Sequence, residues 1–298
     1  MNLESIYKKD GKYFLNEHQY FIVYKDILKQ NLKKISFPCI ILDTEFINKS
    51  HFLKEFEQLG AVNLNSDEEA TYLKNIIITI NFSFARNYED ILKRDNQKAI
   101  KSIKMVRKKK MNASIFYEQY RKLIYDFINI VNKKNIKTLV FAGKANDEAI
   151  INEWFEKIKF KFKPKILITN SVKSQIKAVD IYDTLESSFE FSNVNNNGEQ
   201  FVDPKNYGVN TKNNLLKIKS QKTFFEYFKS ITSINFEEDE KIYDLCCQAY
   251  YFFAKENLNE QEFNKGSLII KSINMHCKND VLKSLLLIKF FCLAKKLS

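Results

Sequence analysis

Two carboxylates two positions apart lie within an apolar run, where acidic side chains are costly to bury. Residues 37–47 read FPCIILDTEFI and carry Asp43 and Glu45. A short apolar run bounded by polar segments predicts a strand that is buried on both faces. The period of a strand puts both carboxylates on one face, where they repel each other unless a divalent cation lies between them. The spacing therefore indicates a metal site, and the alternative is a solvated strand end.

A third acidic residue follows another predicted strand. Residues 137–142 read KTLVFA, and the turn Gly-Lys-Ala-Asn leads from them to Asp147 at the start of a predicted helix. Taken alone, Asn146 or Asp147 could be an ordinary helix N-cap.

The fourth acidic residue is Asp280, four positions after His276 in the segment HCKNDVLKSLLLI. On a helix, residues four apart share a face, so the two side chains could meet. The alternatives are that Asn279 or Asp280 caps the final helix and that His276 is a core or surface histidine.

The elements that must position these residues alternate between strand and helix. Apolar runs predict three sequential strands at 37–47, 56–64 and 75–84, as in an antiparallel meander. Beyond them come an amphipathic helix, the strand 137–142, a helix and a strand at 165–169. The helical spacing rests on six apolar residues: Phe116, Tyr120, Leu123, Ile124, Phe127 and Val131. This alternation predicts an α/β sandwich.

The chain reads as one domain with an extension. Residues 1–35 alternate aromatic and charged side chains and form a predicted N-terminal extension, and residues 36–298 form the domain. The Asn-rich segment 190–220 is predicted to be a surface loop or insertion, and the last 80 residues are predicted to be helical.

Composition favours a folded protein with an anionic partner. The 298 residues are 45% hydrophobic and carry a formal net charge of +12. Such a chain can bury a large core, and its positive field suits nucleic acid. A basic cluster at Arg107, Lys108, Lys109 and Lys110 could bind a phosphate backbone. Its alternative is a solvated lysine run.

The cysteines and the apolar segments predict a cytoplasmic protein. The five cysteines include no C-x-x-C pair, and their odd number disfavours a disulfide framework. The N-terminus has no basic-then-apolar signal pattern. The longest apolar stretch, 281–297, contains Lys283, Lys289 and Lys295, so it is too short and too charged to span a bilayer. The sequence does not indicate an oligomeric state.

Together these segments resemble the DEDD exonuclease superfamily, the DnaQ-like or RNase-T-like three-prime exonucleases. The family's first-strand Asp-x-Glu corresponds to Asp43 and Glu45, and its following "IGAV" strand to 58–62, QLGAV. The family's second Asp corresponds to Asp147. Its last Asp, preceded on a late helix by His or Tyr, corresponds to Asp280. The parts agree in order from about residue 37 to residue 298, and each motif alone is short.

The resemblance implies a ribonuclease-H-like fold, with a mixed central sheet that starts with three antiparallel strands and is flanked by helices. It also implies a 3′-5′ exonuclease that hydrolyses DNA or RNA, with a single-stranded three-prime end favoured. Two departures stand out. The histidine lies four positions before the last Asp, which is the spacing of the family's tyrosine subclass. The chain between the second and last Asp is also longer than usual, which the Asn-rich segment explains.

The implied chemistry is two-metal hydrolysis with Mg²⁺ or Mn²⁺, since carboxylate ligands suit hard cations. Asp43 would bridge both ions. Glu45 and Asp280 would complete one ion, Asp147 would act on the other largely through water, and His276 would be the general base. One alternative is a nucleic-acid-binding module that keeps the fold without turnover. Another is a structural interaction protein, in which Asp43 would pair with a basic residue.

Overall fold

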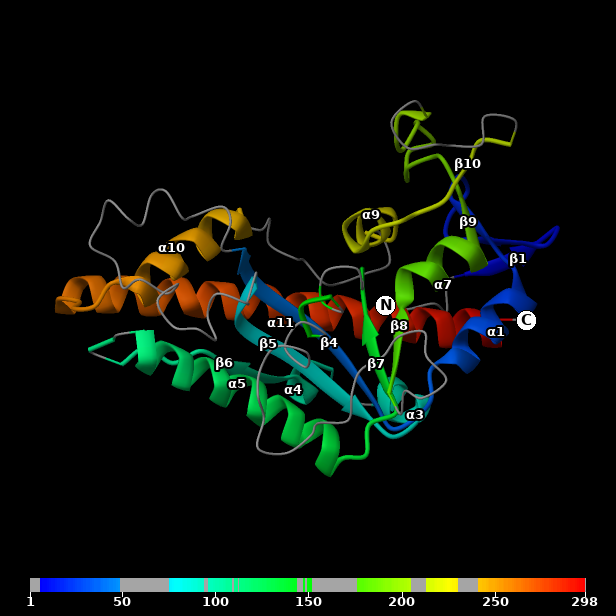
Figure 1. Cartoon of the computed structure of the whole chain (residues 1–298). Coiled ribbons are helices and arrows are strands. Elements are labelled where there is room, and N and C mark those ends of the chain that lie inside the picture. Colours follow the sequence, from blue (N-terminus) through cyan, green and yellow to red (C-terminus); the bar gives the residue numbers. More distant parts are fainter. Residues whose placement is uncertain are drawn as a thin grey trace.

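The computed structural model describes most of the chain. The described residues are 6–48, 75–93, 96–108, 110–111, 113–143, 147, 149–151, 176–204, 213–229 and 241–297. Two five-stranded sheets and one long helix organise this part (Figure 1).

The first sheet is mixed and starts with three antiparallel strands. Its spatial order is β6 (Lys101–Lys104), β5 (Asn75–Ala85), β4 (Cys39–Asn48), β7 (Thr138–Phe141) and β8 (Lys177–Asp180). β4, β5 and β6 pair antiparallel, whereas β7 and β8 run parallel to β4. The predicted α/β class is therefore confirmed, and so are the strands predicted at 37–47, 75–84 and 137–142.

The meander differs from the prediction in its third strand. β4 pairs directly with β5. The third antiparallel strand is β6, in a segment for which the sequence predicted no strand. β6 has one half-buried position among exposed ones, so it gave no apolar run to recognise. The predicted strands 56–64 and 165–169 lie outside the described residues.

Two helices cover the two faces of this sheet (Figure 1). α5 (Ala113–Lys133) packs on one face, where Phe127 and Tyr120 share a buried cluster with Leu42 of β4. Its amphipathic pattern confirms the predicted helix. α11 (Glu260–Lys296) crosses the other face against β4 and β5 and begins with a capping box formed by Asn259 and Glu262.

The second sheet joins the N-terminal residues to a distant segment. Its spatial order is β1 (Tyr7–Lys9), β2 (Lys12–Phe14), β3 (Tyr20–Val23), β9 (Phe189–Ser192) and β10 (Leu215–Leu216), all antiparallel. β9 and β10 fall within or beside the Asn-rich segment 190–220, a predicted surface loop or insertion. Residues 196–200 are exposed, but the start of the segment is not a surface loop, because it continues β9 and Phe191 and Asn193 are fully buried.

The remaining described helices are α1 (Lys25–Lys34), α3 (Tyr88–Lys93), α4 (Asn96–Ala99), α7 (Ile181–Ser188), α9 (Gln221–Tyr227) and α10 (Ile242–Ala254). α9, α10 and α11 confirm the predicted helical C-terminal region. α10 and α11 pack closely at Gly266, where a Cβ would lie 1.9 Å from Cδ2 of Phe252.

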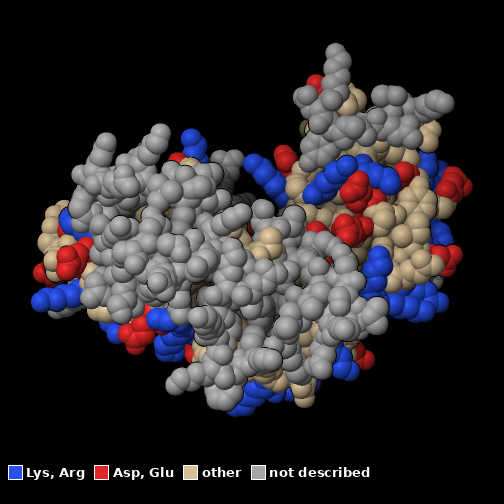
Figure 2. Space-filling model, viewed as in Figure 1, with Lys and Arg blue, Asp and Glu red and all other residues tan. Residues whose placement is uncertain are grey.

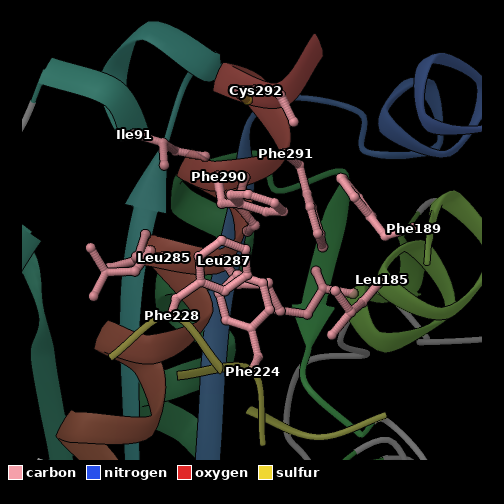
Figure 3. Close-up of a cluster of buried hydrophobic side chains, with 14 of the residues drawn as sticks. Ile91, Leu185, Phe189, Phe224, Phe228, Leu285, Leu287, Phe290, Phe291 and Cys292 are labelled. Atoms are coloured by element: carbon pink, nitrogen blue, oxygen red, sulfur yellow. The ribbon is translucent and has the colours of Figure 1, made fainter. Parts of the chain in front are cut away.

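A second buried cluster lies around the C-terminal half of α11. Figure 3 shows Phe224 and Phe228 beside Phe290, with ring centroids 5.1 and 5.0 Å from the Phe290 ring. Phe189 of β9 packs on the same ring at 5.1 Å. The aromatic residues of α9 therefore belong to the core. This cluster joins the second sheet to α11.

All five cysteines are free thiols, as predicted. Among the described residues no helix combines the length and the apolar character that crossing a membrane requires.

Candidate metal centre

The centre lies where one face of β4 changes from apolar to acidic. Cys39 and Ile41 are fully buried, and the next positions on their face are Asp43 and Glu45. A register shift between Glu45 and Phe46 marks a β-bulge in the β4–β5 pair. Bulges bend a strand and redirect side chains, and they are common beside active sites.

α11 lies over this acidic face and brings the late residues to it. His276 Nε2 lies 3.5 Å from Glu45 Oε1 and 3.4 Å from Asp280 Oδ2. The Cys277 thiol donates to the backbone carbonyl oxygen of Asp43 at 3.2 Å. α11 includes both His276 and Asp280, so Asp280 is not the cap of the final helix.

Asp147 reaches the centre from the end of β7. Gly143 has a φ of +86°, a conformation that favours glycine, and its N–H donates to Asp180 Oδ1 at 3.1 Å. Asp180 also caps α7 by accepting from the Tyr182 N–H. Asp147 is 7% exposed, and its Oδ1 accepts a short hydrogen bond from the Thr44 hydroxyl. Asp147, four positions after Gly143, is thus held against β4.

The four acids interact electrostatically. Burial raises the pKa of Asp43 well above its usual range, and the charges of Asp147, Glu45 and Asp280 raise it further. Asp43 Oδ2 is inaccessible to solvent and has no hydrogen-bond partner among the described residues. The charges that perturb this carboxyl belong to acids rather than to a lysine or arginine. Among the described residues, Asp43 therefore has no basic partner of the kind that a purely structural role would give it.

The pKa values of two neighbouring side chains are raised as well, in part by the charges of the same acids. Burial raises the pKa of Asp147 to about 6, with a further contribution from Asp280, while hydrogen bonds from Thr44 oppose the shift. Burial also raises the pKa of Tyr182 on α7, and the charges of Asp280, Asp180 and Asp43 add to it. The Tyr182 phenol accepts from the Gln221 N–H at 3.2 Å, so α7 and α9 border the acidic cluster.

The donor set fits a divalent cation. Ligand atoms of Glu45, His276 and Asp280 lie within 4.8 Å of one another, and so do those of Asp43, Glu45 and Cys277. The two groups share Glu45. Mostly carboxylate donors suit Mg²⁺ or Mn²⁺. The unpartnered Asp43 oxygen is a group that a cation would satisfy.

A polar network supports this face, and the sequence interpretation missed it. Asn81 and Thr79 on β5 are the cross-strand partners of Asp43 and Glu45. Thr79 Oγ1 and Asn81 Nδ2 both donate to Asn274 Oδ1 of α11, at 2.8 and 3.2 Å. Polar residues at alternate positions of NIIITINFSF were the available signal.

Three other residues at the centre were also missed. Thr44 holds Asp147, and Cys277 lies fully buried under Asp43. Lys283 places Nζ 2.8 Å from Asp280 Oδ1. Its position three residues after Asp280 on a helix could have predicted that ion pair.

The basic cluster is divided by the fold. Arg107 is 7% exposed, and its guanidinium donates to the carbonyl oxygen of Lys108 and to those of Phe252, Lys255 and Glu256 at the C-terminal end of α10. This corrects the prediction for Arg107, whose side chain is enclosed in the protein. Lys108 and Lys110 are exposed.

Lys109 of that cluster and residues 58–62 of the "IGAV" match lie outside the described residues. No family model matches the chain, and no curated protein matches it.

Proposed function

We propose that this protein is a metal-dependent 3′-5′ exonuclease that hydrolyses phosphodiester bonds of DNA or RNA. The observation that carries the proposal is the convergence of ligand atoms of Asp43, Glu45, His276, Cys277 and Asp280 in two groups that share Glu45, each within 4.8 Å. Beside them lies a buried Asp43 oxygen that has no hydrogen-bond partner among the described residues. Clustered carboxylates with little counter-charge are costly to maintain, and binding of Mg²⁺ or Mn²⁺ would offset that cost.

The arrangement of the first sheet supports the same proposal. Three antiparallel strands are followed by two strands parallel to β4, which is the mixed sheet that a ribonuclease-H-like fold implies. Helices flank the sheet on both faces, and the acids lie on its central strand, at the end of β7 and on the last described helix.

The cation would supply Lewis-acid stabilisation of the phosphoryl oxygens and acidify an attacking water. Asp43, Glu45, Asp147 and Asp280 would hold it. The hydroxyl of Thr44 keeps Asp147 in place, and Lys283 and His276 fix the two oxygens of Asp280.

His276 would accept the proton of the attacking water. Its Nε2 faces both Glu45 and Asp280, so the imidazole lies among the acids that would hold the cation. We expect His276→Ala to lower turnover by about 10²–10⁴-fold, the usual contribution of a general base. Metal affinity, followed by calorimetry, should change little. Turnover near that of the wild type would exclude His276 from proton transfer.

The decisive experiment follows a labelled oligonucleotide in Mg²⁺ or Mn²⁺. We expect shortening from the three-prime end that EDTA abolishes and that Asp43→Asn eliminates. Internal fragments appearing first would indicate an endonuclease. Binding of metal and oligonucleotide without any cleavage would favour the non-catalytic binding module. The Asp280–Lys283 ion pair is compatible with that module, because it already balances part of the negative charge of the acids.

A further inference from the structure

The hairpin of β1 and β2 presents one buried face and one exposed face. Asp10 and Gly11 form its turn with φ values of 48° and 76°, the pattern of a tight hairpin turn. Tyr13 and Phe21 lie opposite each other and are buried against the second cluster. The adjacent pairs of the same strands must therefore project to the other face.

That outer face carries a row of three aromatic rings. Tyr7 pairs with Phe14 across the strands, and Phe14 pairs with Tyr20. The Tyr7 and Phe14 rings are stacked, with centroids 5.2 Å apart and an interplanar angle of 9°. Phe14 and Tyr20 follow at 5.3 Å. Tyr7 is 49% exposed and lies on β1, an edge strand of the sheet. The stack therefore ends in an accessible ring.

Two lysines lie beside this row. Lys9 is exposed on β1 and pairs across the strands with Lys12, on the same face as the Tyr7–Phe14 pair. Lys12 Nζ lies 4.3 Å from the centroid of the Tyr20 ring. Acidic side chains also lie nearby: Asp10 in the turn, and Glu190, which accepts a hydrogen bond from the Tyr24 phenol at 2.6 Å. Cations and aromatic rings thus alternate on one small surface.

We infer that this outer face of β1, β2 and β3 binds single-stranded nucleic acid. Unpaired bases can extend the Tyr7–Phe14 stack, and the lysines can contact the phosphates beside them. A paired duplex keeps its bases stacked on each other and offers only phosphates, so the rings favour single strands. An aliphatic protein partner would gain little from the charged lysines.

If the acidic centre hydrolyses nucleic acid, as proposed above, its distance from this face sets the length of strand that can contact both at once. The Tyr13 phenol donates to the carbonyl of Leu297, so the hairpin lies at the C-terminal end of α11 (Figure 1). Asp280 precedes Leu297 by 17 positions, which at 1.5 Å per residue is about 25 Å. A strand with about 3.4 Å per nucleotide needs roughly seven nucleotides or more to reach from one to the other.

The test measures binding of labelled single-stranded oligonucleotides of four to twenty nucleotides in EDTA, where hydrolysis is blocked. Tyr7→Leu, Phe14→Leu and Tyr20→Leu keep apolar cover and remove the planar ring. Tyr125→Leu is the matched control, because Tyr125 is 37% exposed on α5, away from the hairpin. Thermal unfolding establishes that each variant is folded, and Tyr7→Leu alters only an exposed edge strand.

We expect each ring substitution to weaken binding at least about five-fold, for short and long oligonucleotides alike, because in EDTA the acidic centre holds no cation that could bind phosphates. Tyr125→Leu should bind as the wild type does. Unchanged affinity in all three ring variants would overturn the inference, whether or not hydrolysis occurs. Lost binding to anionic lipid vesicles, with oligonucleotide binding intact, would overturn it in favour of a membrane surface. Weakened oligonucleotide binding without any hydrolysis would uphold it and count against the proposed exonuclease.

Discussion

The centre is built around Asp43, a residue that we expect to destabilise the metal-free protein. Asp43 has an inaccessible oxygen without a partner among the described residues and lies in the field of three other acids. Removing its charge should therefore relieve repulsion and desolvation while it destroys the site. Stability and activity should change in opposite directions at this one position.

Asp43→Asn tests this opposition. We expect hydrolysis to fall by roughly 10³-fold or more, since cation binding supplies several kcal/mol of transition-state stabilisation. In EDTA the melting temperature should rise, by roughly 2–4 °C for each kcal/mol of strain relieved. Added Mg²⁺ should no longer stabilise the variant, as calorimetry and thermal unfolding would show.

The control is Asp126→Asn, because Asp126 pairs with Lys122 on the exposed side of α5. Its stability should stay within about 0.5 kcal/mol of the wild type. An Asp43→Asn protein that melts lower than the wild type in EDTA would contradict the repulsion argument.

The second residue-scale prediction concerns Asp147 and pH. Its pKa of about 6 in the folded protein exceeds its ordinary value of 3.8, so the folded state binds the proton more tightly than the unfolded state. The ionised folded state is therefore penalised: the penalty is absent below about pH 4 and complete above about pH 6. The metal-free wild type should lose up to about 3 kcal/mol of stability across this window.

Thermal unfolding in EDTA from pH 4 to pH 7.5 measures this loss for the wild type and for Asp147→Asn. The difference between the two proteins should grow with pH as Asp147 ionises. A difference that stays constant over the window would mean that Asp147 titrates alike in the folded and unfolded states.

At the scale of elements, α11 joins two cores and carries the centre between them. Ile270 and Ile273 belong to the cluster with α5 and α10, whereas Val281 and Leu285 belong to the cluster with the second sheet. Asn274, hydrogen-bonded to β5, fixes the helix against the sheet beside the acids. Displacement of α11 would therefore move Asp280 relative to β4.

Gly266→Ala tests the packing that holds α11. In an exposed helix this substitution stabilises by up to about 1 kcal/mol, but here the added Cβ would lie 1.9 Å from a ring atom of Phe252. We expect a loss of about 1–3 kcal/mol instead, measured by thermal unfolding. Lys265→Ala, at the exposed neighbouring position, should have little effect.

Phe252→Leu combined with Gly266→Ala completes that test. The double variant should be more stable than the sum of the single effects predicts, because the smaller side chain leaves room for the new methyl group. Additive losses would show that the Phe252 ring is not the obstacle.

At the scale of the whole molecule, the described charged side chains of one face are intermixed. In Figure 2 the lysine and arginine side chains visible on this face lie among acidic ones. If the protein binds nucleic acid as proposed, we expect its net charge of +12 to act through many exposed lysines. Such binding releases counterions and weakens steeply as salt rises.

Changing Lys108, Lys109 and Lys110 to Ala should reduce the salt dependence of oligonucleotide binding. Each lost phosphate contact lowers the slope of log affinity against log salt by about 0.7 for a single strand, so the triple variant should lose up to about 2. Fluorescence anisotropy across a salt series measures the slope. Arg107→Ala should instead lower the melting temperature and leave the slope alone, because its guanidinium serves backbone carbonyls. An unchanged slope in the triple variant would assign the lysines to a solvated surface.

The sequence by itself determined the local elements that carry the acids. Apolar runs predicted β4, β5 and β7, and helical spacing predicted α5. Strand period placed Asp43 and Glu45 on one face. These features follow from which side chains must leave water, and that information is local in the chain.

Only the tertiary structure decided which residues distant in the sequence come into contact. The Cys277 thiol bonds to the Asp43 carbonyl across 234 positions, and the Thr44 hydroxyl bonds to Asp147 across 103. β3 near the N-terminus pairs with β9, and the Arg107 side chain donates to the Phe252 carbonyl oxygen in the last turn of α10. Periodicity records that a face is buried but not which distant element covers it, because many elements present equivalent apolar faces. The pairing depends on the packing of the whole chain.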